Sequence, residues 1–204
     1  MEEEEIVAQE AGEDMVSFDE WKKKRLAEQA QLDRKEGGSK SPTNTPSQSK
    51  VKTSKNRINF ASATCGAKIL TSNNGAQNPA YLLTENKDQY MINSCKAKKW
   101  FIVELCEPVQ VHSIELGNLE LFSSLPQEFV ASISDRYPSK EWKSLGVFHA
   151  REERSIQSFS VGENPIYAKY LKNPIYAKYL KVEMITHYGH EHFCTLSILR
   201  SEVI

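Results

Sequence analysis

Residues 100–105 read Trp-Phe-Ile-Val-Glu-Leu, and this stretch decides the fold class. An apolar run of this length, rich in aromatic and β-branched residues, is typical of a buried β-strand. The strand is predicted to end before Pro108, because proline cannot donate a hydrogen bond to a neighbouring strand. A helix that spans a membrane needs roughly 20 consecutive apolar residues, and no run in the chain approaches that length.

Beyond this strand the sequence continues as short segments in which apolar and polar residues alternate. Such a period of two is the mark of half-buried strands, and turn residues such as 135–139 (DRYPS) separate the segments. Gly146 predicts a bulge or a close approach of two backbones. Helices do not alternate with strands, so an all-β sandwich or barrel is predicted. The further predicted strands are residues 109–116, 129–134, 142–148, 156–159, 179–185 and 195–199.

Residues 1–57 differ from the rest of the chain in charge and composition. Residues 1–20 hold nine acidic and no basic residues, and residues 21–57 hold eleven basic and three acidic ones. The stretch 36–57 is rich in Gly, Ser, Thr, Pro, Lys and Gln, which predicts a disordered linker. We therefore expect a charged leader at 1–57 and one folded domain at 58–204. This domain has 15 basic and 15 acidic residues, and its neutrality argues against nucleic-acid binding.

Within the leader, residues 17–32 predict a short amphipathic helix. Ser17 and Glu20 have the spacing of a capping box, in which each side chain accepts a hydrogen bond from the other residue's backbone N–H. The residues expected on the apolar side are Phe18, Trp21, Leu26 and Leu32. Because an isolated short helix is marginal in water, this side would pack on a partner, on a second copy of the helix, or on the domain. A frayed helix in a tail is the alternative.

A perfect tandem repeat interrupts the domain, since NPIYAKYLK occurs at 164–172 and again at 173–181. The two copies start nine residues apart, which is an odd number. Because side chains alternate between the two faces of a strand, both copies cannot continue one strand with the same face inward. We expect the second copy to form the strand, because Leu180, Val182 and Met184 then alternate inward. The first copy would be a loop or an adjoining short strand.

Four cysteines indicate the compartment of the domain. They are Cys65, Cys95, Cys106 and Cys194. No CxxC or CxxH spacing is present, so a zinc site is not indicated. An even number of cysteines in a β-rich domain suggests two disulfides if the domain matures in an oxidising lumen, and buried thiols if it is cytosolic.

The sequence HYGHEH holds three histidines, His187, His190 and His192, which could converge on a metal ion. The neighbouring Tyr188 and Phe193 favour a packed loop instead, and we expect no metal. No nucleophile–base motif, phosphate loop or nucleotide fingerprint is present. The chain is therefore expected to need no cofactor and to catalyse no reaction.

Four blocks of the domain carry a recognisable pattern. They are FASATCGAKIL (60–70), YMINSCKAKKWFIVELCEPVQV (90–111), LELFSSLPQEFVASISDRYP (119–138) and GHEHFC (189–194). Together they resemble the SUN domain, and more narrowly its SUN-domain ossification factor branch of endoplasmic reticulum membrane proteins. The upstream SFDEWKKK (17–24) resembles the motif that precedes the domain in that branch.

The resemblance implies a galactose-binding-like jelly-roll sandwich that faces the lumen of the endoplasmic reticulum or nuclear envelope. The implied function is to bind and stabilise lumenal or membrane proteins. The sequence shows neither a signal peptide nor a membrane span, so the membrane tether that the family implies is expected outside this chain. In the family, a cysteine before the first central strand pairs with one near the C-terminus, which matches Cys95 and Cys194. Cys65 and Cys106 would form the second pair.

We expect Tyr188, His190, His192 and Phe193 to contact the partner protein, and the leader helix could join two copies of the chain.

Two other functions stay open. A glycan-binding module would stack sugars on exposed aromatic side chains, for which Tyr81, Tyr137 and Tyr188 are candidates. A linker between nucleus and cytoskeleton would clamp KASH-type tails under a long β-hairpin lid, for which residues 70–90 are too short and too polar.

Overall fold

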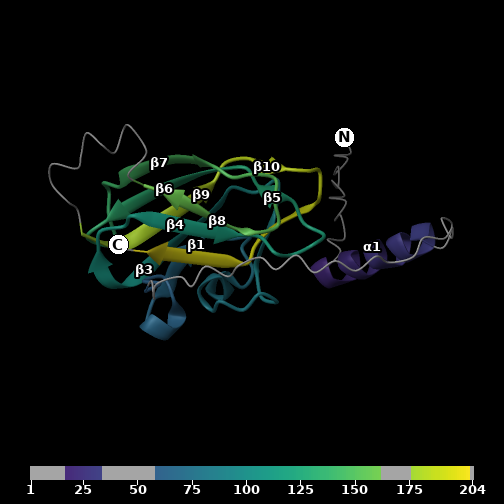
Figure 1. The fold of residues 1–204 in the computed structure, drawn as a ribbon, viewed down its shortest axis with the longest axis horizontal. Helices are drawn as coiled ribbons and strands as arrows, with labels where there is room; N and C mark the ends of the chain where they lie inside the picture. The colour runs from purple at the N-terminus through teal and green to yellow at the C-terminus, as the bar shows by residue number, and fades with distance from the viewer. Residues whose placement is uncertain (1–16, 34–57, 162–175, 203–204) are drawn as a thin grey trace, which may run out of the picture. The chain divides into compact units, whose positions relative to one another are not determined.

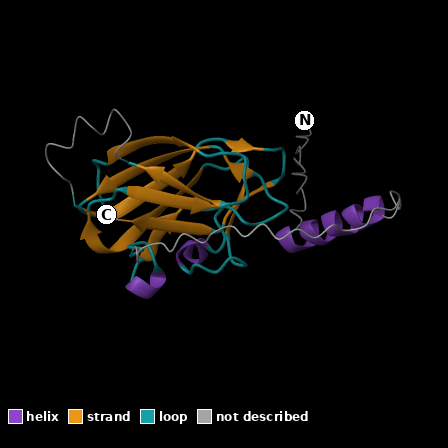
Figure 2. Cartoon of the chain, in the orientation of Figure 1, coloured by secondary structure: helices purple, strands orange, loops and turns teal. Residues whose placement is uncertain are grey.

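Strands dominate the residues that the structure, a computed structural model, describes: 17–33, 58–161 and 176–202 (Figures 1 and 2). The helices are α1 (Phe18–Asp33) and two short 3₁₀ helices, η1 (Ala63–Cys65) and η2 (Pro79–Leu83). The strands are β1 (Lys68–Ser72), β2 (Met91–Ser94), β3 (Lys99–Val109), β4 (Ser113–Gly117), β5 (Leu125–Pro126), β6 (Glu128–Ser134), β7 (Lys143–His149), β8 (Ile156–Ser160), β9 (Ala177–Met184), β10 (His187–Tyr188), β11 (Phe193–Leu196) and β12 (Ile198–Glu202).

Within the described residues the strands form two main sheets and two small ones. The larger sheet has the order β1-β3-β9-β6-β7, and the smaller has the order β12-β4-β8. The pairs β10-β5 and β11-β2 form two-stranded sheets. All pairs of named strands are antiparallel, which confirms the predicted all-β fold without parallel crossovers.

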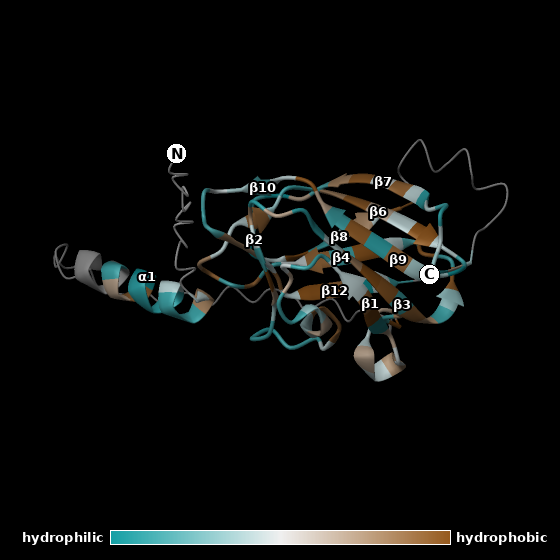
Figure 3. Cartoon of the chain, turned by 180° about the vertical axis from the view of Figure 1, so that it is seen from behind, coloured by the Kyte–Doolittle hydropathy of each residue, from teal (hydrophilic) through white to brown (hydrophobic). Residues whose placement is uncertain are grey.

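The core lies between the two main sheets, where apolar side chains from both meet. Phe129 on β6 stacks on Phe148 of β7 with ring centroids 5.2 Å apart. It also meets Phe159 of β8 edge-on at 4.9 Å, which joins the larger sheet to the smaller. Figure 3 shows the hydrophobic colour concentrated on these strands. The alternation predicted for residues 129–134 is confirmed, since Phe129, Ala131 and Ile133 are all inaccessible to solvent.

Gly146 is the site of the predicted bulge. The register of β6 and β7 shifts here, because Ala131 faces Gly146 whereas the next residue, Ser132, faces Ser144. Leu145 is thus the extra residue, and Gly146 has φ +137°, a conformation that glycine adopts without strain.

Two strand boundaries differ from the prediction. Strand β3 continues through Pro108 to Val109, because its register with β9 shifts between Glu104 and Val109 and requires no N–H from the proline. The single strand predicted at 195–199 is two strands, β11 and β12, which pair with β2 and β4 respectively. Ser197 lies between them, and its N–H donates to the carbonyl of Gly117 at 2.8 Å.

The second copy of the tandem repeat forms the strand, as predicted. Strand β9 begins within it, and Leu180 and Val182 are buried between β3 and β6. A slip of nine residues would place Asn173 where Val182 is, and Pro174 where Glu183 pairs with Trp100 and Val130 in a central strand. Only the second copy is therefore followed by residues that suit this position. The first copy and the linker predicted at 36–57 lie outside the described residues.

Helix α1 begins directly after Ser17, as the capping pattern predicted, and the N–H of Trp21 donates to the Ser17 carbonyl at 2.9 Å. The Arg25 guanidinium lies 5.9 Å from the centre of the Trp21 ring. At this distance the positive charge is attracted by the face of the aromatic ring. Leu26, predicted on the apolar side, is 48% exposed. None of the helices in the described part of the chain is long and apolar enough to cross a membrane.

Candidate functional site

One end of the sandwich is built around the disulfide between Cys95 and Cys194, whose sulfur atoms lie 2.07 Å apart. Cys95 follows β2, and Cys194 lies on β11, the partner strand of β2. The N–H of Cys95 also donates to the carbonyl of His192 at 3.0 Å. Two sequence blocks that are 99 residues apart therefore meet here. We call residues 94–99 and 187–194 the disulfide end.

The second disulfide joins Cys65 of η1 to Cys106 of β3, with the sulfur atoms 1.95 Å apart. Both pairs are the ones that the resemblance implied. At this opposite end of the larger sheet, Glu104 faces Tyr179 on β9, and Tyr179 faces Ser134 on β6. The motifs ELCEP and ISDRYP are thus brought together by strand register.

Lys99 is a buried residue of the disulfide end that the sequence analysis did not single out. Its side chain is 6% exposed, and its ammonium donates to the carbonyls of Cys95 at 2.9 Å and Ala97 at 3.0 Å. Burial lowers the pKa of Lys99. The sequence carries a signal for this burial. Lys99 lies two residues before Phe101 and four before Val103, so on a strand its side chain points to the same inward face as theirs.

His187 lies beside the disulfide, with a ring nitrogen within 4.8 Å of both sulfur atoms. Burial lowers its pKa, and the nearby charges of Lys99 and His190 lower it further. The disulfide prevents the sulfurs from acting as thiolate ligands. Among the described residues, His187, Cys95 and Cys194 are the one grouping with metal-ligand spacing, so the cluster of three histidines gains no geometric support as a metal site.

The four predicted contact residues differ in accessibility. His190 and His192 are exposed. Tyr188 is half-buried, and its hydroxyl donates to the carbonyl of Ala150 at 2.9 Å. Phe193 is only 8% exposed, and the His192 ring packs edge-on against it at 4.6 Å. Its assignment as a contact residue stays a prediction, and on β11 little of this side chain is accessible to a partner.

Exposed lysines flank these histidines. Lys96 and Lys98 precede β3 and are both exposed, whereas Lys99 beside them is buried. The disulfide and the bond from Cys95 to His192 tie the two loops together, so the exposed lysines and histidines lie on neighbouring loops.

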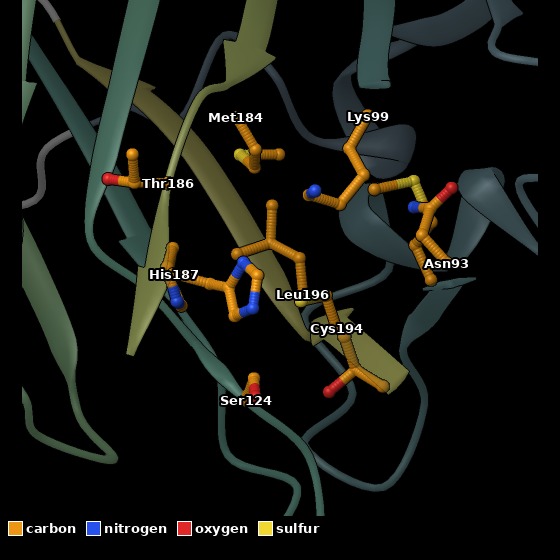
Figure 4. A pocket seen from close by; sticks show the side chains of 11 residues that line it. Asn93, Lys99, Ser124, Met184, Thr186, His187, Cys194 and Leu196 are labelled. Atoms are coloured by element: carbon orange, nitrogen blue, oxygen red, sulfur yellow. The ribbon is translucent and has the colours of Figure 1, made fainter. Parts of the chain in front are cut away.

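The cavity at the disulfide end has a volume of about 10 Å³ (Figure 4). That is room for about one water molecule and far below the roughly 300 Å³ of a small-molecule pocket. A larger hollow of about 540 Å³ is lined by residues of a single turn, 134–143.

The tyrosines proposed for sugar stacking do not gather at one place. Tyr137 is 41% exposed and packs on Tyr179 near the start of β9, with ring centroids 5.8 Å apart. Tyr188 follows the other end of β9, and Tyr81 lies in η2. Residues 70–90, predicted to be too short and too polar for a KASH-binding lid, contain η2, in which Leu82 and Leu83 are buried.

Solved structures with this fold include CBM32-3 of a family 31 glycoside hydrolase and allantoicase. The chain superposes on CBM32-3 from a family 31 glycoside hydrolase of Clostridium perfringens with a TM-score of 0.55 at 9% identity, covering 72% of this chain and 94% of that one. Allantoicase from Saccharomyces cerevisiae gives 0.53 at 13% identity, covering 72% and 43% of the two chains. At such identities the likeness shows the fold alone, a galactose-binding-like jelly-roll sandwich.

Sequence comparisons give closer relatives. The chain is 47% identical over 188 residues to the human SUN domain-containing ossification factor, covering 92% of this chain and 14% of that protein. It is 44% identical to the uncharacterized protein slp1 of Schizosaccharomyces pombe, covering 71% of this chain and 21% of that protein. The chain thus spans less than a quarter of the length of either relative. The family model of the Sad1 / UNC-like C-terminal region matches residues 72–201. The chain therefore belongs to the Sad1/UNC family of SUN-domain proteins.

Proposed function

We propose that this chain is the non-enzymatic, protein-binding module of a membrane-tethered protein, and that it holds its partner at the disulfide end. The observation that carries the proposal is the basic surface of Lys96, Lys98, His190 and His192, displayed on loops that a disulfide fixes. Preorganised loops bind with a smaller entropic cost than mobile ones. The partner segment is acidic, since the exposed charges here are mostly positive.

Two disulfides support a lumenal location for the module, because such bonds persist in the endoplasmic reticulum and are rare in the cytosol. Membership in the SUN family supports the endoplasmic reticulum membrane or nuclear envelope as the compartment. Helix α1 would add a second contact, with another copy or with a partner. The absence of a pocket of ligand size at the disulfide end favours a protein partner over a small substrate.

The test compares partner capture by charge-reversed variants of the whole chain expressed in the endoplasmic reticulum lumen. Proteins cross-linked to the wild type are identified first. Lys96→Glu with Lys98→Glu should then reduce their recovery roughly tenfold, because reversed charges at an interface repel the partner. The matched control is Lys140→Glu with Lys143→Glu, which makes the same charge change at exposed residues of the opposite end. Equal recovery from both variants would contradict the proposal.

A further inference from the structure

Lys99 carries a buried positive charge for which the described residues show no acidic partner. It takes part in none of the ion pairs found within the described ranges of the chain. Its two hydrogen bonds go to neutral carbonyls, those of Cys95 and Ala97. A buried charge without a counter-charge is unfavourable, and proteins ordinarily pair such groups.

The cavity beside Lys99 is lined by groups that can donate hydrogen bonds. Figure 4 shows the Lys99 and His187 side chains extending toward its middle from opposite sides. Asn93 keeps amide N–H groups to offer, since its carbonyl oxygen accepts from Asn73 at 2.8 Å. The hydroxyl of Ser124 accepts from the N–H of Glu191 at 3.2 Å, so its proton is available.

None of the described residues that line the cavity is acidic. Glu128 accepts a hydrogen bond from the hydroxyl of the lining residue Thr186 at 3.4 Å, and its other carboxylate oxygen lies 3.2 Å from the ring of His149, which does not belong to the cavity lining. The cavity therefore combines a buried ammonium, an imidazole and neutral hydrogen-bond donors.

We propose that this cavity is a binding site for one small inorganic anion of the size of chloride, held by Lys99, His187, Asn93 and Ser124. The volume of about 10 Å³ is room for one species of about the size of a water molecule, so the site takes a single small ion and excludes larger anions such as phosphate. The ion supplies the counter-charge that Lys99 lacks. Because Lys99 also binds the loop of residues 94–98, the occupied site stiffens the disulfide end.

The experiment follows the imidazole signals of His187 by NMR in the whole chain while chloride replaces gluconate at constant ionic strength. The signals should shift and saturate, since a bound anion changes the field at the ring. Lys99→Met should weaken the anion affinity about tenfold or more, because it removes a charged hydrogen-bond donor. Lys140→Met is the matched control, because this lysine is exposed and lies at the opposite end of the domain, and it should leave the affinity unchanged.

A second measurement does not depend on the folding of a variant. Crystals of the wild-type chain grown with bromide should show an anomalous-scattering peak between Lys99 and His187. The proposal is overturned by a water molecule at that place without such a peak, or by His187 signals that respond to chloride in the same way in wild type and Lys99→Met.

Discussion

Removal of the Cys95–Cys194 disulfide by Cys95→Ala and Cys194→Ala is expected to destabilise the domain more than removal of the other disulfide. The first bond joins residues 99 positions apart, and the second, Cys65–Cys106, joins residues 41 positions apart. A cross-link stabilises a fold mainly by restricting the unfolded chain, and the effect grows with the logarithm of the loop length.

The chain-entropy relation gives the magnitudes. It predicts a loss of about 4.7 kcal/mol in unfolding free energy for the longer loop and about 3.9 kcal/mol for the shorter one. Burial adds to the difference, because Cys194 is 8% exposed and lies on a strand, whereas Cys65 is exposed on η1. The double variant at Cys95 and Cys194 should therefore be the less stable of the two by about 1 kcal/mol or more.

The assay is urea unfolding of oxidised wild type and both double variants, followed by tryptophan fluorescence. The slope of unfolding free energy against urea concentration should be equal for the three proteins, since the difference in midpoint then reports a difference in stability. A loss below about 1 kcal/mol for the longer loop, or the reverse order of the two variants, would refute the reasoning.

Three further predictions concern packing, pH and the leader. Gly117→Ala should lower the unfolding free energy by about 1–3 kcal/mol in urea titration, because the added Cβ would lie 3.0 Å from the Ile156 side chain. Burial lowers the pKa of His187, so folding stability should fall as the pH drops from about 6.5 through that lowered pKa, and His187→Gln should remove this part of the pH dependence. Limited proteolysis should cut first within residues 33–57 and leave a resistant fragment beginning near residue 58, as mass spectrometry would show.

The period-two signal explains why most strands could be predicted. In β6 and β9 one face is buried and the other is half-exposed. The alternating apolar residues Phe129 and Ala131 of β6, and Leu180 and Val182 of β9, therefore predict these strands from the sequence. The passage from β11 to β12 carries no such signal. Every residue of 195–199 is buried, and only hydrogen bonds to partners distant in sequence show that the chain changes sheets at Ser197.

The site was only partly predictable. Histidines and cysteines drew attention because their chemistry is distinctive, and the loop with His190 and His192 is indeed exposed. Phe193 could not be placed by this reasoning, since its burial depends on pairing with β2. Lys99 was overlooked because a lysine next to Lys98 is ordinarily solvated. Its burial follows from the register of β3 against β9, where Lys99 faces Met184.

Site-specific photo-cross-linking tests the central claim most directly. A photoreactive residue replaces His192 at the disulfide end, or Lys140 at the opposite end, in the whole chain within the endoplasmic reticulum lumen. Both positions are exposed, so the two probes have comparable access to neighbouring proteins. The account predicts a discrete protein adduct from position 192 that disappears when Lys96→Glu and Lys98→Glu are added. An equally strong adduct from position 140, or one from 192 that survives the charge reversal, would contradict it.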